Sequence, residues 1–413
     1  MHYQKLPSTS QRSQYRLRTF LQGKRGAVAC LVGHPLGTHV ACGGRVHFLV
    51  SDLVFHTNIG EDGTKVWNLK TSVLLKSPAG SGNRGATTAI SWIIRPDDAE
   101  EGLAFGTNDG YLSVWKREKT DSFIEVYCNR LVGGPDGDEI SGIAYDASSG
   151  QLGVVQRSES VHRFVMDPSM KPVVVRSVKI PKHWPQAVAF GQTGIRGPEL
   201  WSFGREDGVI HVLNDEGKVL KTRLTGSVIG HAAINVKEDA LIMDDVSQGV
   251  AVYKLSTTDR IKTFEVPSTT RRLRFVAFHD GNSAIVMGSD HGKVYIFDRR
   301  TGNIIDIIDI GVNDWVQSIA TIEEAGVPLI LVGRSGENIG KTEIFVWEKV
   351  MVPLKAEKAR RGGLRKEALT LMWLLSALFV LENVLVSDVA FDQDLLKSTP
   401  RRESLSPTIS VIA

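Results

Sequence analysis

One short pattern recurs along most of this sequence, and that recurrence limits the chain to a small set of folds. The pattern is an apolar run, a polar turn that often contains Asp-Gly, and an alternating strand that closes on a large apolar residue. Clear copies are Leu103–Trp115, Leu200–Leu213 and Ile285–Phe297, and weaker ones are Val154–Val165 and Ala240–Tyr253. Asp-Gly suits a tight turn because glycine adopts positive φ without strain. Each copy therefore predicts a β-hairpin.

The spacing of the hairpins indicates how they assemble. The closing residues lie 40 to 50 residues apart, and they are Trp67, Trp115, Val165, Leu213, Tyr253, Phe297 and Trp347. In five copies a strand-ending residue stands nine places before the closing one: Gly106, Gln156, Gly204, Asp244 and Gly288. An opening strand precedes each hairpin, and a fourth strand follows some of them. Four strands repeating about every 45 residues are typical of a β-propeller. The sequence therefore predicts an all-β fold of seven four-stranded blades.

With these repeats the chain resembles the WD-repeat family. The pairs standing where that family has Trp-Asp are Trp67-Asn68, Trp115-Lys116, Phe297-Asp298 and Trp347-Glu348. The family's Gly-His pair before an opening strand is clear only at Gly230-His231, so its buried His, Ser, Asp and Trp hydrogen-bond set is not expected in most blades. The resemblance covers roughly residues 15 to 350 and implies a non-catalytic protein-interaction scaffold.

The repeats also define the expected domain boundaries. Residues 1–14 form a basic tail, residues 15–350 the propeller, and residues 351–413 a C-terminal extension. The alternating stretch 15–21 predicts an outer strand of the last blade, which would close the ring. An acid-poor, arginine-rich start is also compatible with a mitochondrial transit peptide. The strand is the preferred interpretation because the stretch alternates rather than showing a helical stripe.

The first hairpin contains an apolar insertion at residues 45–60, between Val40–Gly44 and Glu61–Trp67. Insertions in turns are normally polar, so this one has two interpretations. One is a functional loop that binds a partner through an apolar patch. The other is non-coding sequence translated through a gene-model error.

The C-terminal extension combines a basic cluster at 355–366 with an apolar stretch, for which we expect a helix over 367–390 and a disordered end. Residues 368–381 carry no charge, but a bilayer span needs about 20 apolar residues and would bury Glu382. We therefore expect the helix to pack on protein. Membrane anchoring through 368–389 remains the alternative. The basic cluster is either a linker or a nuclear import signal.

No sequence motif points to catalysis, a cofactor or a metal. Residues 335–342 approach a P-loop, but Ser335 replaces the first glycine and Thr342 precedes an expected strand, so a hairpin turn is predicted. The three cysteines form no Cys-x-x-Cys pair, which favours a reducing, intracellular compartment. The net charge of +3 argues against a chain built to coat nucleic acid.

A binding surface remains as the expected functional feature. In a propeller, the loops before the opening strands and the turns inside the hairpins gather on one rim of the channel. The candidate partner-binding residues of this rim are Arg84, Asn108, Asp109, Asp138, His183, Trp184, Arg205, Arg271, Arg272 and Trp315. Trp184, in the loop 182–185, is the first choice for a contact, because tryptophan favours interface hot spots and a loop bounded by Pro185 is expected to be exposed and stiff. The alternative is that Trp184 folds back over its blade. Arg271 and Arg272 are either a site for an acidic or phosphorylated peptide or a solvated loop.

Two classes of function stay open at this point. The favoured one is a non-catalytic scaffold that presents the rim to other proteins, in the cytoplasm, the nucleus or both. The alternative is a hydrolase-like propeller enzyme with carboxylates or a metal at the channel mouth. The turn positions Asp109, Ser158, Glu206, Ser247 and Asp290 are mixed in type, which favours the scaffold.

Overall fold

The protein, represented by a computed structural model, divides into two units, Met1–Val350 and Met351–Ala413. The structure describes residues 13–23, 26–45, 63–78, 84–96, 101–119, 121–131, 138–194, 197–311, 313–336, 341–350 and 371–377. In the second unit the described residues 371–377 are helical and exposed. The basic cluster at 355–366, the rest of the expected helix and the expected disordered end lie outside the described residues.

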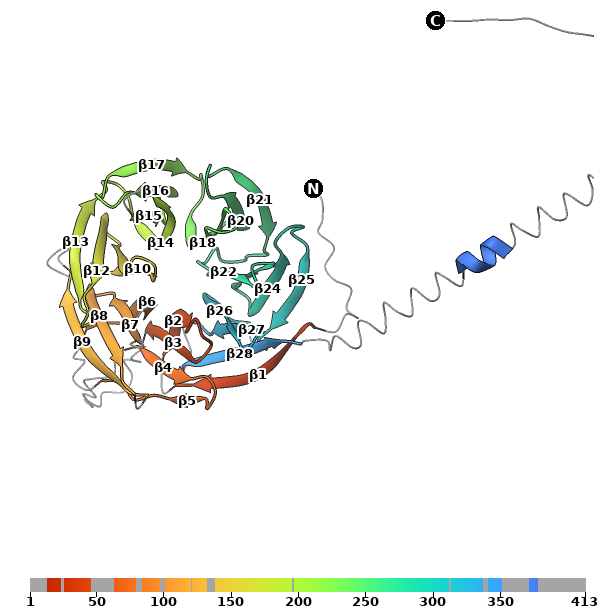
Figure 1. The fold of residues 1–413 in the computed structure, drawn as a ribbon, viewed down its shortest axis with the longest axis horizontal. Coiled ribbons are helices and arrows are strands. Elements are labelled where there is room, and N and C mark those ends of the chain that lie inside the picture. Colours follow the sequence, from red (N-terminus) through yellow and green to blue (C-terminus); the bar gives the residue numbers. More distant parts are fainter. Residues whose placement is uncertain are drawn as a thin grey trace, which may run out of the picture. The chain divides into compact units, whose positions relative to one another are not determined.

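The described part of the first unit is a ring of seven four-stranded antiparallel sheets (Figure 1), which confirms the predicted propeller. Each blade begins with an inner strand beside the channel. These inner strands are β2 (Ala27–Gly33), β6 (Thr87–Ile94), β10 (Ile140–Asp146), β14 (Pro185–Gly194), β18 (Ile229–Asn235), β22 (Val276–His279) and β26 (Ser318–Glu324). The second strands are β3 (His39–Arg45), β7 (Glu101–Thr107), β11 (Gln151–Gln156), β15 (Gly197–Gly204), β19 (Ala240–Asp245), β23 (Ala284–Met287) and β27 (Val327–Gly333).

The remaining strands complete each blade toward the outside. The third strands are β4 (Lys65–Asn68), β8 (Tyr111–Arg117), β12 (Ser160–Met166), β16 (Val209–Leu213), β20 (Gly249–Lys254), β24 (Lys293–Asp298) and β28 (Glu343–Lys349). The outer strands are β5 (Val73–Leu74), β9 (Phe123–Arg130), β13 (Pro172–Lys179), β17 (Val219–Leu224), β21 (Arg260–Glu265), β25 (Ile304–Asp309) and β1 (Tyr15–Gln22).

The N-terminal strand closes the ring as predicted. Strand β1 pairs antiparallel with β28, so the last blade contains the first and the last strand of the propeller. Leu21 is buried with Val28 and Trp67 of the first blade and with Ile344 and Val346 of the last. A single apolar cluster thus joins the two ends of the ring.

The hairpin turns follow the chemistry expected of Asp-Gly. Gly110 and Gly208 adopt φ values of 81° and 60°, which residues with a side chain rarely adopt. In the first hairpin, His39 pairs with Asn68 and Cys42 with Lys65, so the strands on both sides of the predicted insertion form one hairpin. Residues 46–60 of that insertion lie outside the described residues, and both interpretations of it stay open.

One predicted closing residue is wrong. Trp115 pairs with Leu103 and Phe297 with Ile285, but the equivalent partner of Leu152 in the third blade is Phe164 rather than Val165. Phe164 is fully buried, whereas Val165 is 37% exposed. The turn between Gln156 and Ser160 is short, and neighbouring residues of a strand face opposite sides. Because the predicted alignment was off by one residue, it assigned the buried position to Val165 instead of Phe164.

Candidate functional site

The loops and turns predicted to form a rim lie on the same side of the ring. In five blades, the second to the fifth and the seventh, a backbone hydrogen bond joins the loop before the inner strand to the turn that follows the second strand. The Arg205 amide donates to the Trp184 carbonyl at 2.8 Å, and the Arg157 amide donates to the Glu139 carbonyl at 2.8 Å. These backbone bonds fix the turn side chains relative to the loop side chains.

The ring encloses a central channel of about 1220 Å³. Its charged lining is concentrated at the rim side, where four arginines and one glutamate, Glu139, contribute. We call Arg157, Arg205, Arg271 and Arg272 the arginine mouth. Toward the other end the described lining is uncharged and includes Val32, Tyr145 and Thr321. The described charged residues of the channel lining are therefore confined to one end of the channel.

Four of the ten predicted rim residues line this channel: Arg205, Arg271, Arg272 and Trp315. The other six are used within the blades or stand outside the channel lining. Arg84 forms an ion pair with Glu125, and Asn108 accepts a hydrogen bond from the Ala86 amide. Asp109 accepts through its carbonyl from Arg130, and Asp138 is buried and accepts from Ser158.

His183 forms hydrogen bonds with a serine and an aspartate of its own blade. Its Nε2 lies 2.8 Å from the Ser202 hydroxyl and its Nδ1 lies 2.7 Å from the Asp207 carboxylate. His183 and Ser202 are almost completely buried. Lys182 rather than glycine precedes His183, so the Gly-His pattern, which is clear only at Gly230-His231, did not mark this position. His231 instead lies on the inner strand β18 and lines the channel.

Trp184, next to His183, is the exposed aromatic residue of this loop. Its side chain is 40% exposed, so it does not fold fully back over its blade. Its carbonyl holds the Arg205 turn through the backbone bond described above. Trp184 therefore lies close to the arginine mouth while remaining outside the channel lining.

The loop that carries Arg271 is held in place by Asp290. This carboxylate accepts hydrogen bonds from the backbone amides of Thr269 and Thr270, both at 2.6 Å, and from their hydroxyls. Burial would raise the pKa of Asp290, but hydrogen bonds with His291 and from these amides outweigh it and hold the pKa well below its usual value. Arg271 itself has a φ of 48°. The loop is thus fixed by an ionised carboxylate.

Arg272 and Trp315 form a second contact at the mouth. The Arg272 guanidinium lies 5.0 Å from the centre of the Trp315 ring, within the range of a cation–π interaction. The indole N–H donates to the Leu273 carbonyl at 2.9 Å, which orients the ring. Both residues are therefore positioned by contacts between neighbouring blades.

The two remaining arginines of the mouth differ in their partners. Arg157 donates to Glu139 at 2.9 Å and to Gln186 at 2.7 Å. Arg205 is partly buried, and its guanidinium makes no hydrogen bond or ion pair with any residue that the structure describes. Burial, together with the charge of Arg157, lowers the pKa of Arg205. The negative charges of Glu206 and Glu139 act against this fall, but neither carboxylate forms an ion pair with Arg205 among the described residues.

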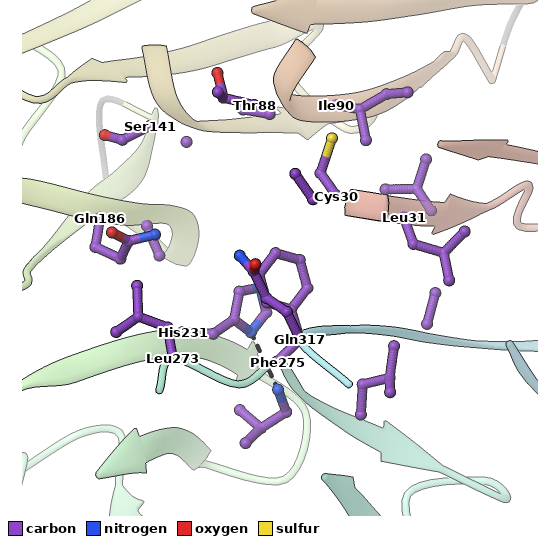
Figure 2. Close-up of a pocket in the computed structure, with 18 of the residues that line it drawn as sticks. Cys30, Leu31, Thr88, Ile90, Ser141, Gln186, His231, Leu273, Phe275 and Gln317 are labelled. Atoms are coloured by element: carbon purple, nitrogen blue, oxygen red, sulfur yellow. Dashed lines mark hydrogen bonds between the residues drawn. The ribbon is translucent and has the colours of Figure 1, made fainter. Parts of the chain in front are cut away.

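Below the mouth the channel carries an aromatic stack. The His231 and Phe275 rings lie 4.1 Å apart and nearly parallel, with Gln317 beside them (Figure 2). The His231 Nδ1 accepts from the Val276 amide at 3.4 Å. Burial lowers the pKa of His231 to about 4, so its ring is neutral at pH 7. The interior thus offers an uncharged surface of mixed apolar and polar side chains beneath a cationic entrance.

Several lining residues were not predicted: Glu139, Arg157, Gln186, His231, Phe275 and Gln317. For Arg157 the signal was present, because it follows the strand-ending Gln156 just as Arg205 follows Gly204. The repeat alignment therefore already placed both arginines at the same turn position. The other residues lie in or beside inner strands, whose channel-facing positions the hairpin pattern does not mark.

Among the residues that the structure describes, no group of three or more His, Cys, Asp or Glu is placed to hold a metal ion. No helix within the described ranges is long and apolar enough to cross a membrane. Of the P-loop-like stretch, Thr342 directly precedes β28, as predicted, and residues 337–340 lie outside the described residues.

Comparison of the sequence with models of known protein families finds no match, and comparison with curated proteins finds none either.

Proposed function

We propose that this protein is a non-catalytic scaffold that presents the rim of its propeller to other proteins. The observation that carries the proposal is the grouping of interface-type residues on one side of the ring. Trp184 is partly exposed, and the arginine mouth lies beside it, with Arg205 and Arg271 unpaired among the described residues. Tryptophan and arginine contribute most to protein–protein hot spots.

We further propose that the chain is a divergent WD-repeat protein. Three features support this assignment: the His183–Ser202–Asp207 hydrogen bonds, the Asp-Gly turns, and the closing residues Trp67 and Trp115. The three free cysteines are compatible with a reducing compartment, so we place the protein in the cytoplasm or nucleus. Imaging of a fluorescent fusion in living cells would test the compartment.

A propeller enzyme is the competing proposal, and one cluster gives it a specific form. His183, Ser202 and Asp207 have the residue types of a hydrolase triad. Ser202, however, has no exposed surface, so its hydroxyl is not accessible to a substrate. We therefore interpret the cluster as structural. Hydrolysis of a generic ester that disappears in Ser202→Ala with unchanged folding would overturn this interpretation.

The scaffold proposal is tested by affinity purification with the double variant Trp184→Ala/Arg271→Ala. We expect it to lose partners that the wild type retains. The matched control is Val173→Ala/Arg176→Ala on the exposed outer strand β13, which removes a comparable apolar and a comparable cationic side chain away from the rim. Identical partner sets for the wild type and the rim variant would rule out this surface.

A further inference from the structure

The described residues that line the arginine mouth carry more positive than negative charge. Four arginines against one glutamate leave a net of three positive charges among the described residues that line the channel. Glu139 is already engaged by Arg157. Arg205 and Arg271 make no side-chain hydrogen bond or ion pair with a described residue. Two guanidinium groups are therefore available to an incoming anion.

Arg205 is the stronger of the two sites. Its guanidinium is partly buried and makes no hydrogen bond or ion pair with a described residue; burial and the charge of Arg157 lower its pKa, and the charges of Glu206 and Glu139 only partly oppose this. Such a group gains free energy when an anion arrives, because its lost hydration is replaced by charge-assisted hydrogen bonds. A planar guanidinium can engage both oxygens of one carboxylate.

Arg271 is presented by a loop that is already ordered. Asp290 binds the amides of Thr269 and Thr270 and so fixes the backbone immediately before Arg271. A ligand does not have to order this loop on binding, which lowers the entropic cost. Beside it lies the flat Trp315 ring, with the Arg272 guanidinium 5.0 Å from its centre.

The placement of the arginines favours a chain with several anionic groups. Arg157 follows β11, Arg205 follows β15, and Arg271 precedes β22, so the cations belong to the third, fourth and sixth blades. Carboxylates spaced along an extended polypeptide suit cations spread around a mouth better than one compact anion does. Nucleic acid is disfavoured because a single basic cluster with Glu139 in it is not a stripe that follows a phosphate backbone.

We propose that the arginine mouth binds an acidic segment of a partner protein, with Arg205 and Arg271 each engaging a carboxylate. This inference rests on the proposed scaffold function and specifies the chemistry of the partner. The segment lies across the channel entrance, and its backbone and apolar side chains contact Trp315 and the top of the channel. Binding is expected to weaken as ionic strength rises, because the interacting charges are partly exposed.

The test uses the full chain and a fluorescein-labelled pool of ten-residue peptides built from Asp, Glu, Gly and Leu. An otherwise identical pool with Asn and Gln in place of the acids is the uncharged comparison. Fluorescence polarisation is measured for the wild type, Arg205→Gln, Arg205→Lys and Arg271→Gln. The control Arg300→Gln removes an equal charge from the exposed turn between β24 and β25, and circular dichroism checks the fold of every variant.

The expected result is binding of the acidic pool and not of the uncharged pool. Arg205→Gln and Arg271→Gln should each weaken binding at least about tenfold, as expected for loss of a charge-assisted hydrogen bond. Arg205→Lys should lose less, because it keeps the charge without the guanidinium fork. Arg300→Gln should bind as the wild type does.

Three outcomes would overturn the inference. The first is equal loss in Arg300→Gln and Arg205→Gln, which would show attraction by overall charge only. The second is binding of tripolyphosphate or a single-stranded oligonucleotide in an Arg205-dependent manner, with no binding of the acidic pool. The third is no binding of the acidic pool at all. If Trp184-dependent partners are still captured in that third case, the scaffold proposal stands while the acidic-segment inference fails.

Discussion

At the residue scale, the loop that carries Arg271 and Arg272 also contains Arg274, which forms a fully buried ion pair with Asp244. Arg274 Nη2 lies 2.9 Å from Asp244 Oδ1, and the Arg274 amide donates to Asp244 Oδ2 at 2.8 Å. Neither side chain has exposed surface. Burial raises the pKa of Asp244 to about 7, and Arg274 acts against this rise. The pair joins the fifth blade to the loop before the sixth.

Breaking this pair should be costly. We expect Asp244→Leu to lower the free energy of unfolding by about 3–5 kcal/mol, because it leaves the Arg274 charge buried without a partner. Replacing both residues, as in Asp244→Leu/Arg274→Met, should recover most of the loss. Urea unfolding midpoints measure both effects. If the double variant is as unstable as the single one, the ion pair contributes net stability that apolar side chains at these positions do not replace.

The buried histidines make stability depend on pH. Burial lowers the pKa of His162 to about 4 from its ordinary value of 6.5. The unfolded chain therefore binds a proton near pH 6.5 that the folded chain accepts only near pH 4. Stability from this group is complete above pH 6.5 and is lost as the pH falls toward 4, by up to about 3 kcal/mol.

The variant His162→Gln tests this dependence. We expect its unfolding midpoint to change less between pH 7 and pH 4.5 than that of the wild type, although His231 and His279 keep part of the effect. Chemical unfolding followed by tryptophan fluorescence at several pH values provides the measurement. If the unfolding midpoints of the two proteins change equally with pH, His162 does not contribute to the pH dependence of stability.

The single residues show where sequence reasoning reached its limit. The large closing side chains were predictable, since a residue such as Trp115 ends an alternating strand. The two partners of Arg157 were not predictable, because Glu139 and Gln186 lie in segments separated along the chain, and neither was the absence of a hydrogen-bond partner for the Arg205 guanidinium among the described residues. The buried role of Asp138 was missed for the same reason, since its Ser158 partner lies in the following turn.

At the scale of elements, strand β1 contributes more to stability than its edge position suggests. Leu21 is 1% exposed and packs on the first and last blades, whereas Leu17 on the same strand is 47% exposed. We expect Leu21→Ala to cost about 2–5 kcal/mol and Leu17→Ala less than about 0.5 kcal/mol. Thermal unfolding of both variants gives the comparison, and similar losses would contradict the closure role of this strand.

The elements were the most predictable level of this fold. Strand 15–21 alternates in polarity, so its pairing with the last blade could be proposed from sequence alone. The predicted alignment of the third hairpin was shifted by one residue, because its turn is short and its run of valines does not show which face is buried. Turn length is decided by backbone geometry, which a hydrophobic pattern reports only indirectly.

At the scale of the whole molecule, the ring is complete before the second unit begins. The Val350 amide donates to the Gln14 carbonyl immediately after β28, and the first unit ends at that residue. We expect a chain ending at residue 354 to unfold at the same temperature as the full chain. A lowered midpoint would show that residues beyond 354 stabilise the propeller. Fractionation of cells expressing both chains would test membrane anchoring through 368–389.

The function of the whole molecule was the least predictable level. Repetition along the sequence reports the architecture, because each blade must bury the same faces. A binding surface is instead built from residues that break the repetition, such as Arg271 and Trp315. Four of ten rim residues reach the channel lining because the remaining six are mostly engaged inside their own blades.

The pairing of β1 with β28 has a consequence for the way the chain is made. About 330 residues separate Gln22 from Lys349, so a ribosome working at roughly 5–20 residues per second needs about 16 to 65 s between the two strands. During that time the apolar side of β1 waits without its partner strand. A message that stops early yields a chain whose first strand never finds its neighbour. Ring closure thereby distinguishes finished from unfinished chains, and unfinished ones are exposed to chaperones and proteases.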